Sequence, residues 1–100
     1  IKLRKYVDFI IGAEKTDKGK PSPDPYLFAV KKHKLYSDQC IAFEDTKNGI
    51  ISAKKAGLFC AGISCFKKDG QRLENADIVY KNFNDIDLDN LIKNKNSKSQ

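Results

Sequence analysis

Two adjacent carboxylates stand at a junction in the sequence where chemistry is possible. In FEDTKNGIISAKKAG, residues 43–57, Glu44 and Asp45 follow a short apolar run and precede a helical pattern. Their mutual repulsion has to be offset. A nearby Lys or Arg could do this, and so could a hard cation such as Mg2+, which takes one or two protein carboxylates together with phosphate oxygens and water. Acidic residues also favour helix N-termini, so the pair alone leaves both interpretations open.

A lysine in a stiff turn is the second candidate. Lys20 stands between Gly19 and Pro21, and Pro21 restricts it to extended backbone angles. The following Ser-Pro-Asp-Pro, residues 22–25, has the pattern of a helix start, with a capping serine, a proline in the first turn and an acid near the positive end of the dipole. The backbone therefore sets the direction of the Lys20 side chain, and a compact ammonium there would suit a phosphate group.

Apolar patterning predicts the elements that must hold these residues. Strands are expected at residues 6–12, 40–43, 58–66 and 76–80, and helices at 23–34, 48–56 and 88–94. Strands that alternate with helices of this length form parallel β-α-β units with right-handed crossovers. We therefore expect an α/β fold with a Rossmann-like, three-layer parallel sheet. Ligands collect at the carboxyl ends of such strands, and Glu44 and Asp45 lie at one of those ends.

The same patterns predict which helix residues face the core and where the second helix ends. Leu27 and Val30 are expected to face the core from the first helix, and Ile50 or Ile51 with Ala53 and Ala56 from the second. Gly57 stands where a left-handed helix C-cap belongs. Asp77, before the last strand, is interpreted as a turn residue.

The motifs of this sequence resemble those of a known superfamily. GKPSPDPYLFAVKK, followed by IAFEDTKNGIISAKKAG, is similar to the third and fourth motifs of the haloacid dehalogenase-like hydrolases, in the branch of phosphoglycolate phosphatases and β-phosphoglucomutase. The resemblance extends from about Tyr6 to Asn94. It implies a Mg2+-dependent phosphoric monoester hydrolase that acts on a small phosphorylated metabolite through an aspartyl-phosphate intermediate.

The resemblance also assigns roles to residues. It implies that Lys20 is catalytic and holds the phosphoryl group, that Glu44 and Asp45 bind the catalytic Mg2+, and that Asn48 supports that site from behind the ligands. The resemblance also implies that Asp45 is catalytic, because it binds the metal.

Parts of the superfamily pattern are absent from this sequence. There is no D-x-D-G-T motif to supply the nucleophilic aspartate, no motif-two Ser or Thr, and no helical cap domain. The resemblance places the nucleophile strand beside the strand at residues 40–43. We therefore expect residues 1–92 to be the C-terminal portion of a core domain that lacks this strand and the cap, with residues 93–100 as a polar tail. The rest of a longer chain would be needed to complete the sheet, and this part alone is expected to be inactive.

The composition of the chain disfavours some classes of binding partner. The net charge of +6 comes from scattered lysines, half of the excess lies in the tail, and Arg4 and Arg72 are the only arginines, which disfavours nucleic acid. No apolar stretch approaches the roughly 20 residues that cross a bilayer, so no membrane role is expected. Three cysteines without a C-x-x-C pair favour a reducing cytoplasm.

Two alternatives to a phosphatase stay open. One is a phosphotransferase similar to β-phosphoglucomutase. The other is a non-catalytic fragment that serves as a binding module.

Overall fold

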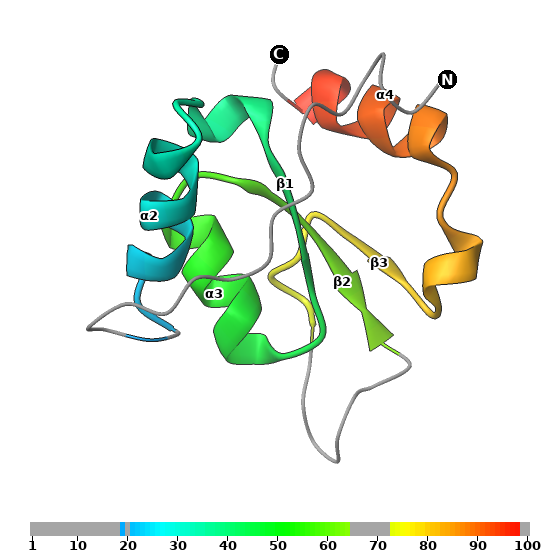
Figure 1. The fold of residues 1–100 in the computed structure, drawn as a ribbon. Coiled ribbons are helices and arrows are strands. Elements are labelled where there is room, and N and C mark those ends of the chain that lie inside the picture. Colours follow the sequence, from blue (N-terminus) through cyan, green and yellow to red (C-terminus); the bar gives the residue numbers. More distant parts are fainter. Residues whose placement is uncertain (1–18, 20, 65–72, 99–100) are drawn as a thin grey trace.

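A short parallel sheet forms the centre of the molecule (Figure 1). The computed structural model describes residues 19, 21–64 and 73–98 of the 100-residue chain. Its strands and α-helices, in chain order, are α2 (Asp24–Lys32), β1 (Ile41–Glu44), α3 (Lys47–Lys55), β2 (Phe59–Ile63), β3 (Ile78–Tyr80) and α4 (Leu88–Lys98). Two 3-10 turns, η1 (Ser37–Gln39) and η3 (Phe83–Asp85), precede β1 and α4.

The sheet has the parallel topology that the sequence predicts. Its order is β1-β2-β3, with Ile41 opposite Phe59 and Ala61 opposite Ile78. Helix α3 connects β1 to β2, as a parallel pair requires. The α/β fold class is therefore confirmed. The strand expected at residues 6–12 lies outside the described residues.

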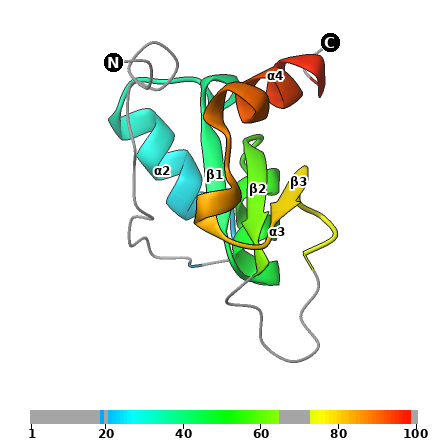
Figure 2. The same cartoon turned by 90° about the vertical axis from the view of Figure 1, so that its right-hand side faces the viewer.

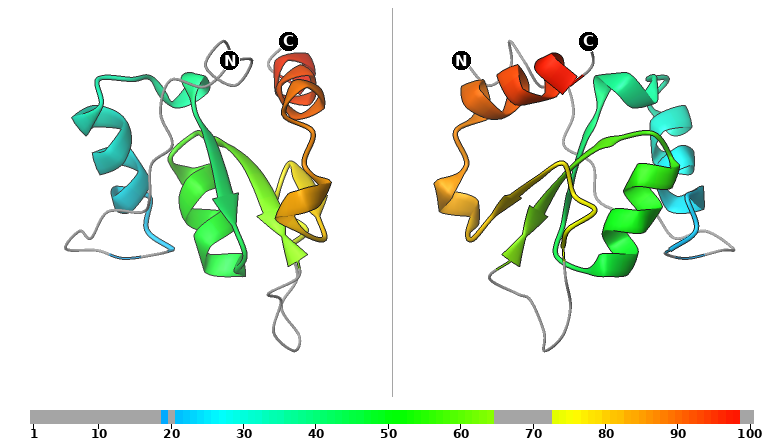
Figure 3. Two further views of the ribbon diagram at one scale, coloured as in Figure 1. Left: turned by 45° about the vertical axis from the view of Figure 1, so that its right-hand side comes forward. Right: turned by 180° about the vertical axis from the view of Figure 1, so that it is seen from behind.

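The helices cover both faces of the sheet (Figures 2 and 3). On one face, α2 and α3 pack over a cluster that includes Val30, Ala42 and Ile50. On the other face, Leu91 of α4 is fully buried against Phe59 and Ala61. Because side chains of a strand alternate between its faces, β2 can supply both clusters, and all five of its residues are buried.

Helix α2 differs from the expectation in its length and in its buried side. It ends at Lys32 and not near residue 34, where Lys34 takes the positive backbone angle φ of 57°. The prediction that Leu27 faces the core is wrong, because this side chain is 44% exposed. The prediction for Val30 is confirmed, and Pro25 and Ala29 are buried with it, so the core stripe is rotated around the helix away from Leu27.

Helix α3 agrees closely with the expectation. Ile50, Ala53 and Ala56 are buried, and Gly57 follows with φ of 86°. That left-handed conformation is one that glycine adopts at little cost.

Helix α4 extends further than the sequence indicated. The segment expected to fray as a polar tail is helical as far as Lys98. Lys95 donates a hydrogen bond to the carbonyl of Asp38 in η1, which ties the helix to the segment before β1. None of the helices within the described ranges is long and apolar enough to cross a membrane.

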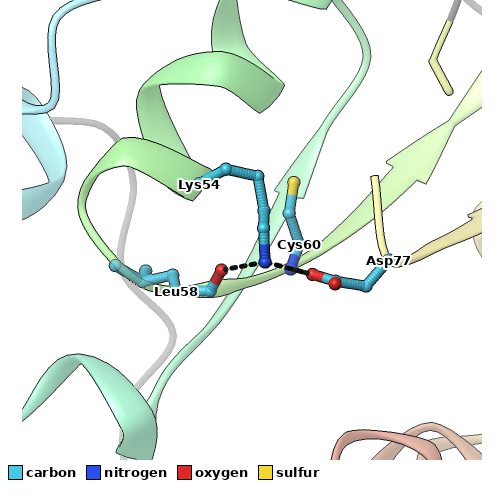
Figure 4. Close-up of polar contacts among 4 residues, drawn as sticks. All are labelled: Lys54, Leu58, Cys60 and Asp77. Carbon is cyan, nitrogen blue, oxygen red and sulfur yellow. Dashed lines mark hydrogen bonds and ion pairs between the residues drawn. The ribbon is translucent and has the colours of Figure 1, made fainter. Parts of the chain in front are cut away.

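Asp77 joins the end of α3 to the two C-terminal strands (Figure 4). Its Oδ2 atom accepts hydrogen bonds from the backbone N–H of Cys60 and from Lys54 Nζ, both at 2.8 Å. Lys54 Nζ also donates to the carbonyl of Leu58 at 3.2 Å. Asp77 is thus more than the turn residue expected from the sequence, because its carboxylate bridges two elements.

We expect Asp77→Ala to lower the free energy of unfolding by about 1–3 kcal/mol, since it leaves the Cys60 N–H without its acceptor. Lys54→Ala should cost at most about 1 kcal/mol, because that ion pair is partly exposed. Urea denaturation measures both. Asp77→Asn is the matched control, since its amide oxygen can still accept from Cys60. Equal losses for Asp77→Ala and Lys54→Ala would contradict this account.

Candidate active site at the carboxyl end of strand β1

The two acids lie where β1 passes into α3. Glu44 is the last residue of β1, Asp45 follows it, and Thr46 is the N-cap of α3 (Figure 1). Thr46 is extended, and its Oγ1 accepts a hydrogen bond from the N–H of Gly49 at 3.0 Å. The helix therefore starts at a fixed point directly after the acids, and the positive end of its dipole favours negative charge there.

The side chain of Glu44 is buried on the face of the sheet that α2 and α3 cover. It is 6% exposed, and the hydroxyl of Tyr26, from α2, donates a hydrogen bond to its Oε2. Its other oxygen lies against Gly49, where an added Cβ would overlap the carboxyl group. The absence of a side chain at residue 49 therefore makes the space that Glu44 occupies.

The hydroxyl of Tyr26 is the donor in its hydrogen bond to Glu44. Burial, the hydrogen bond to Glu44 and the charge of Glu44 together raise the pKa of Tyr26 far above its ordinary value. The proton thus stays on the tyrosine, and the carboxylate accepts.

The carboxylate of Asp45 has a different environment. It is half-buried, and within the described residues it accepts no hydrogen bond and forms no ion pair. The structure therefore separates the two acids: Glu44 is inside and bonded to Tyr26, whereas the oxygens of Asp45 are available to a ligand.

The structure says less about the other two predicted site residues, Asn48 and Lys20. Asn48 is exposed in the first turn of α3 and makes no hydrogen bond to the part of the chain that the structure describes. Lys20 lies outside the described residues.

Ser22, two residues after Lys20 in the sequence, is hydrogen-bonded to α3. The N–H of Ser22 donates to the carbonyl of Gly19 at 3.0 Å, which closes a turn. The hydroxyl of the fully buried Ser52, in α3, donates to the carbonyl of Ser22 at 2.6 Å. Ser22 Oγ also accepts from the N–H of Asp24 at 3.2 Å, although the N-cap position of α2 is Pro23 and not Ser22 as predicted.

The acids have the right chemistry for Mg2+ but do not form a complete site. Hard carboxylate oxygens suit this ion, and Asp45 offers two that the described residues leave unbonded. No group of three or more His, Cys, Asp or Glu side chains in the described ranges could hold a metal. Phosphate oxygens, water or other protein groups would have to supply the remaining ligands.

Sequence reasoning missed three residues that shape the site. Thr46 had a signal, because a threonine before an apolar helical pattern is a typical N-cap. Gly49 had a weaker one, since a glycine inside a helix often has a packing reason. Tyr26 had none, because its contact with Glu44 joins residues 18 positions apart.

Comparisons with known proteins agree with the resemblance in the motifs. Residues 1–63 match the family model described as haloacid dehalogenase-like hydrolase. The chain is 35% identical over 80 residues to a validoxylamine A 7'-phosphate phosphatase of Streptomyces hygroscopicus subsp. limoneus, covering 80% of this chain and 37% of that protein. It is 36% identical over 72 residues to the β-phosphoglucomutase of Bacillus subtilis, covering 72% of this chain and 30% of that protein.

The fold has a similar counterpart among solved structures. A family IA, variant 3 hydrolase of the same superfamily from Entamoeba histolytica matches 95% of this chain and 44% of its own, with a TM-score of 0.72 and 34% sequence identity. The chain thus spans about a third of the length of the curated relatives named above.

Proposed function

Because the chain belongs to the haloacid dehalogenase-like hydrolase family, we propose that it forms part of a Mg2+-dependent phosphatase. The reaction is the hydrolysis of a phosphoric monoester of a small metabolite. The observation that carries the proposal is the half-buried carboxylate of Asp45 at the carboxyl end of a parallel strand, which the described residues leave without a partner.

In this proposal each predicted residue has a role. Asp45 and Glu44 are the metal-binding acids, with Asp45 the more accessible of the two. Lys20 binds the phosphoryl group, and Asn48 supports the acids from the first turn of α3. Bound Mg2+ would supply charge stabilisation to the phosphoryl oxygens as they gain negative charge.

We further propose that other parts of a longer polypeptide complete the site. Within the described residues β1 pairs only with β2, so the other edge of β1, beside Glu44, can accept a strand. Phe43 on this strand is 38% exposed, although its neighbours Ala42 and Glu44 are buried. A nucleophile strand placed there would bring its aspartate next to Asp45. Without it, we expect these residues to be inactive.

A phosphotransferase is the second candidate, and the similarity to the B. subtilis β-phosphoglucomutase favours it. A binding module is disfavoured, because keeping two adjacent acids at one strand end is costly without a cation. A cytoplasmic location is proposed from the cysteine pattern alone, since the sequence has three cysteines and no C-x-x-C pair.

The test is an assay of the full-length protein on a panel of sugar phosphates and small phosphate esters. A phosphatase releases inorganic phosphate when Mg2+ is present and stops when EDTA is added. A mutase instead isomerises a hexose phosphate, and added bisphosphate sustains that reaction. If the protein shows neither of these activities on any compound of the panel, an enzymatic role is contradicted.

We expect Lys20→Ala to raise the KM for the phosphate ester by about tenfold or more, because it removes a point charge that pairs with phosphate. The melting temperature should stay close to that of the wild type, since Lys20 stands between a glycine and a proline in the sequence, a pattern typical of a turn, where substitutions change stability little. Steady-state kinetics and thermal melting provide the two measurements. Lys55→Ala, on the exposed side of α3, is the control; an equal rise in KM for both variants would remove Lys20 from the site.

A further inference from the structure

Tyr26 lies near the acids, and neither the resemblance nor the proposed reaction gives it a role. It lies in the first turn of α2, is partly buried, and packs against the apolar cluster beneath α3. Its hydroxyl donates to Glu44 Oε2. A carboxylate taken out of water is costly unless donors satisfy it, so this hydrogen bond is part of what keeps Glu44 buried at the end of β1.

Both oxygens of Glu44 are located by contacts from different elements. Oε2 accepts a hydrogen bond from the hydroxyl of Tyr26 in α2, and Oε1 lies against Gly49 in α3. The two helices are themselves connected, because Ser52 in α3 bonds the carbonyl of Ser22 just before α2. These contacts restrict the orientation of the carboxyl group, and Tyr26 contributes a hydrogen bond to it.

We propose that Tyr26 is a positioning residue for metal binding, which acts through Glu44 and holds it in the orientation that the acid pair needs. This inference rests on the proposed function. Tyr26 would not contact the ion or the substrate. Partners that orient a metal-binding side chain in this way typically contribute 10-fold to 100-fold to metal affinity.

The experiment measures Mg2+ binding to the full-length protein without substrate, by isothermal titration calorimetry. We expect Tyr26→Phe, which removes only the hydroxyl, to weaken Mg2+ binding by about 10-fold to 100-fold. Tyr36→Phe is the matched control, because that tyrosine is 76% exposed and precedes η1, before the amino end of β1 and not at the carboxyl end where the acids lie. In turnover assays the Mg2+ concentration for half-maximal rate should rise likewise, while kcat at saturating Mg2+ falls much less. Equal Mg2+ affinity in the two variants would overturn the inference.

A double-mutant cycle shows whether Tyr26 acts through Glu44. In a Glu44→Ala background, the further change Tyr26→Phe should leave Mg2+ affinity almost unchanged, because the group that Tyr26 orients has already been removed. A further loss as large as in the wild-type background would refute the route through Glu44. The double variant carries no buried charge at residue 44, so this comparison remains possible if Tyr26→Phe alone does not fold.

Failure of this inference is distinguishable from failure of the proposed function. If the wild type binds Mg2+ and Asp45→Asn weakens that binding, but Tyr26→Phe does not, only the role of Tyr26 is lost. If the wild type binds no Mg2+, the proposed function and this inference are both overturned.

Discussion

Asp45→Asn should reduce Mg2+-dependent turnover of a phosphate ester by about 1,000-fold in the full-length protein. The change keeps the shape of the side chain and removes its charge. Because the carboxylate of Asp45 has no hydrogen-bond or ion-pair partner among the described residues, no folding interaction there is lost with it. The expected result is thus a large kinetic effect with a melting temperature close to that of the wild type, measured in EDTA.

The control for this prediction is another acid on the surface. Asp38 in η1 is exposed and precedes the same strand at its opposite end. Asp38→Asn changes the net charge equally and should leave turnover unchanged. Wild-type rates for Asp45→Asn across a range of Mg2+ concentrations would remove Asp45 from the metal site.

Gly49→Ala should lower both stability and turnover, the latter by about 100-fold, because small displacements of catalytic groups carry penalties of this size. In an exposed helix interior this substitution would stabilise by about 1 kcal/mol. Here the new Cβ would overlap the carboxyl group of Glu44. Overpacking typically costs about 1–3 kcal/mol, so the balance favours destabilisation. Glu44 would have to leave its place beside Tyr26, or α3 would have to shift.

Thermal melting and phosphate release measure the two effects of Gly49→Ala. Gly19→Ala is the stability control, because a Cβ there meets no atom within 4 Å. If the overlap with Glu44 is the cause, Gly49→Ala should cost less stability in a Glu44→Ala background. A variant as stable and as active as the wild type would show that Glu44 does not need the space above residue 49.

The sequence predicted most of the element types, because they depend on local patterns. Alternating strands and helices, the glycine after α3 and the apolar stripe of that helix all agree with the structure. For α2 the prediction was right for Val30 and wrong for Leu27, since both side chains are apolar and only packing decides which of them is buried. The length of α4 was underestimated because its last turns are polar in sequence, while Leu91 and the bond from Lys95 attach it to the fold.

For the candidate site, the sequence by itself determined that two acids follow a parallel strand and precede a helix, since that order is local and its motifs are specific. It could not distinguish Glu44 from Asp45, which are neighbours of the same charge. The tertiary structure decided that Glu44 is buried against Tyr26 and Gly49, whereas Asp45 keeps its oxygens open among the described residues. The physical reason is that burial and hydrogen bonding are set by α2 and α3 together, which meet at this strand end only after the chain has folded.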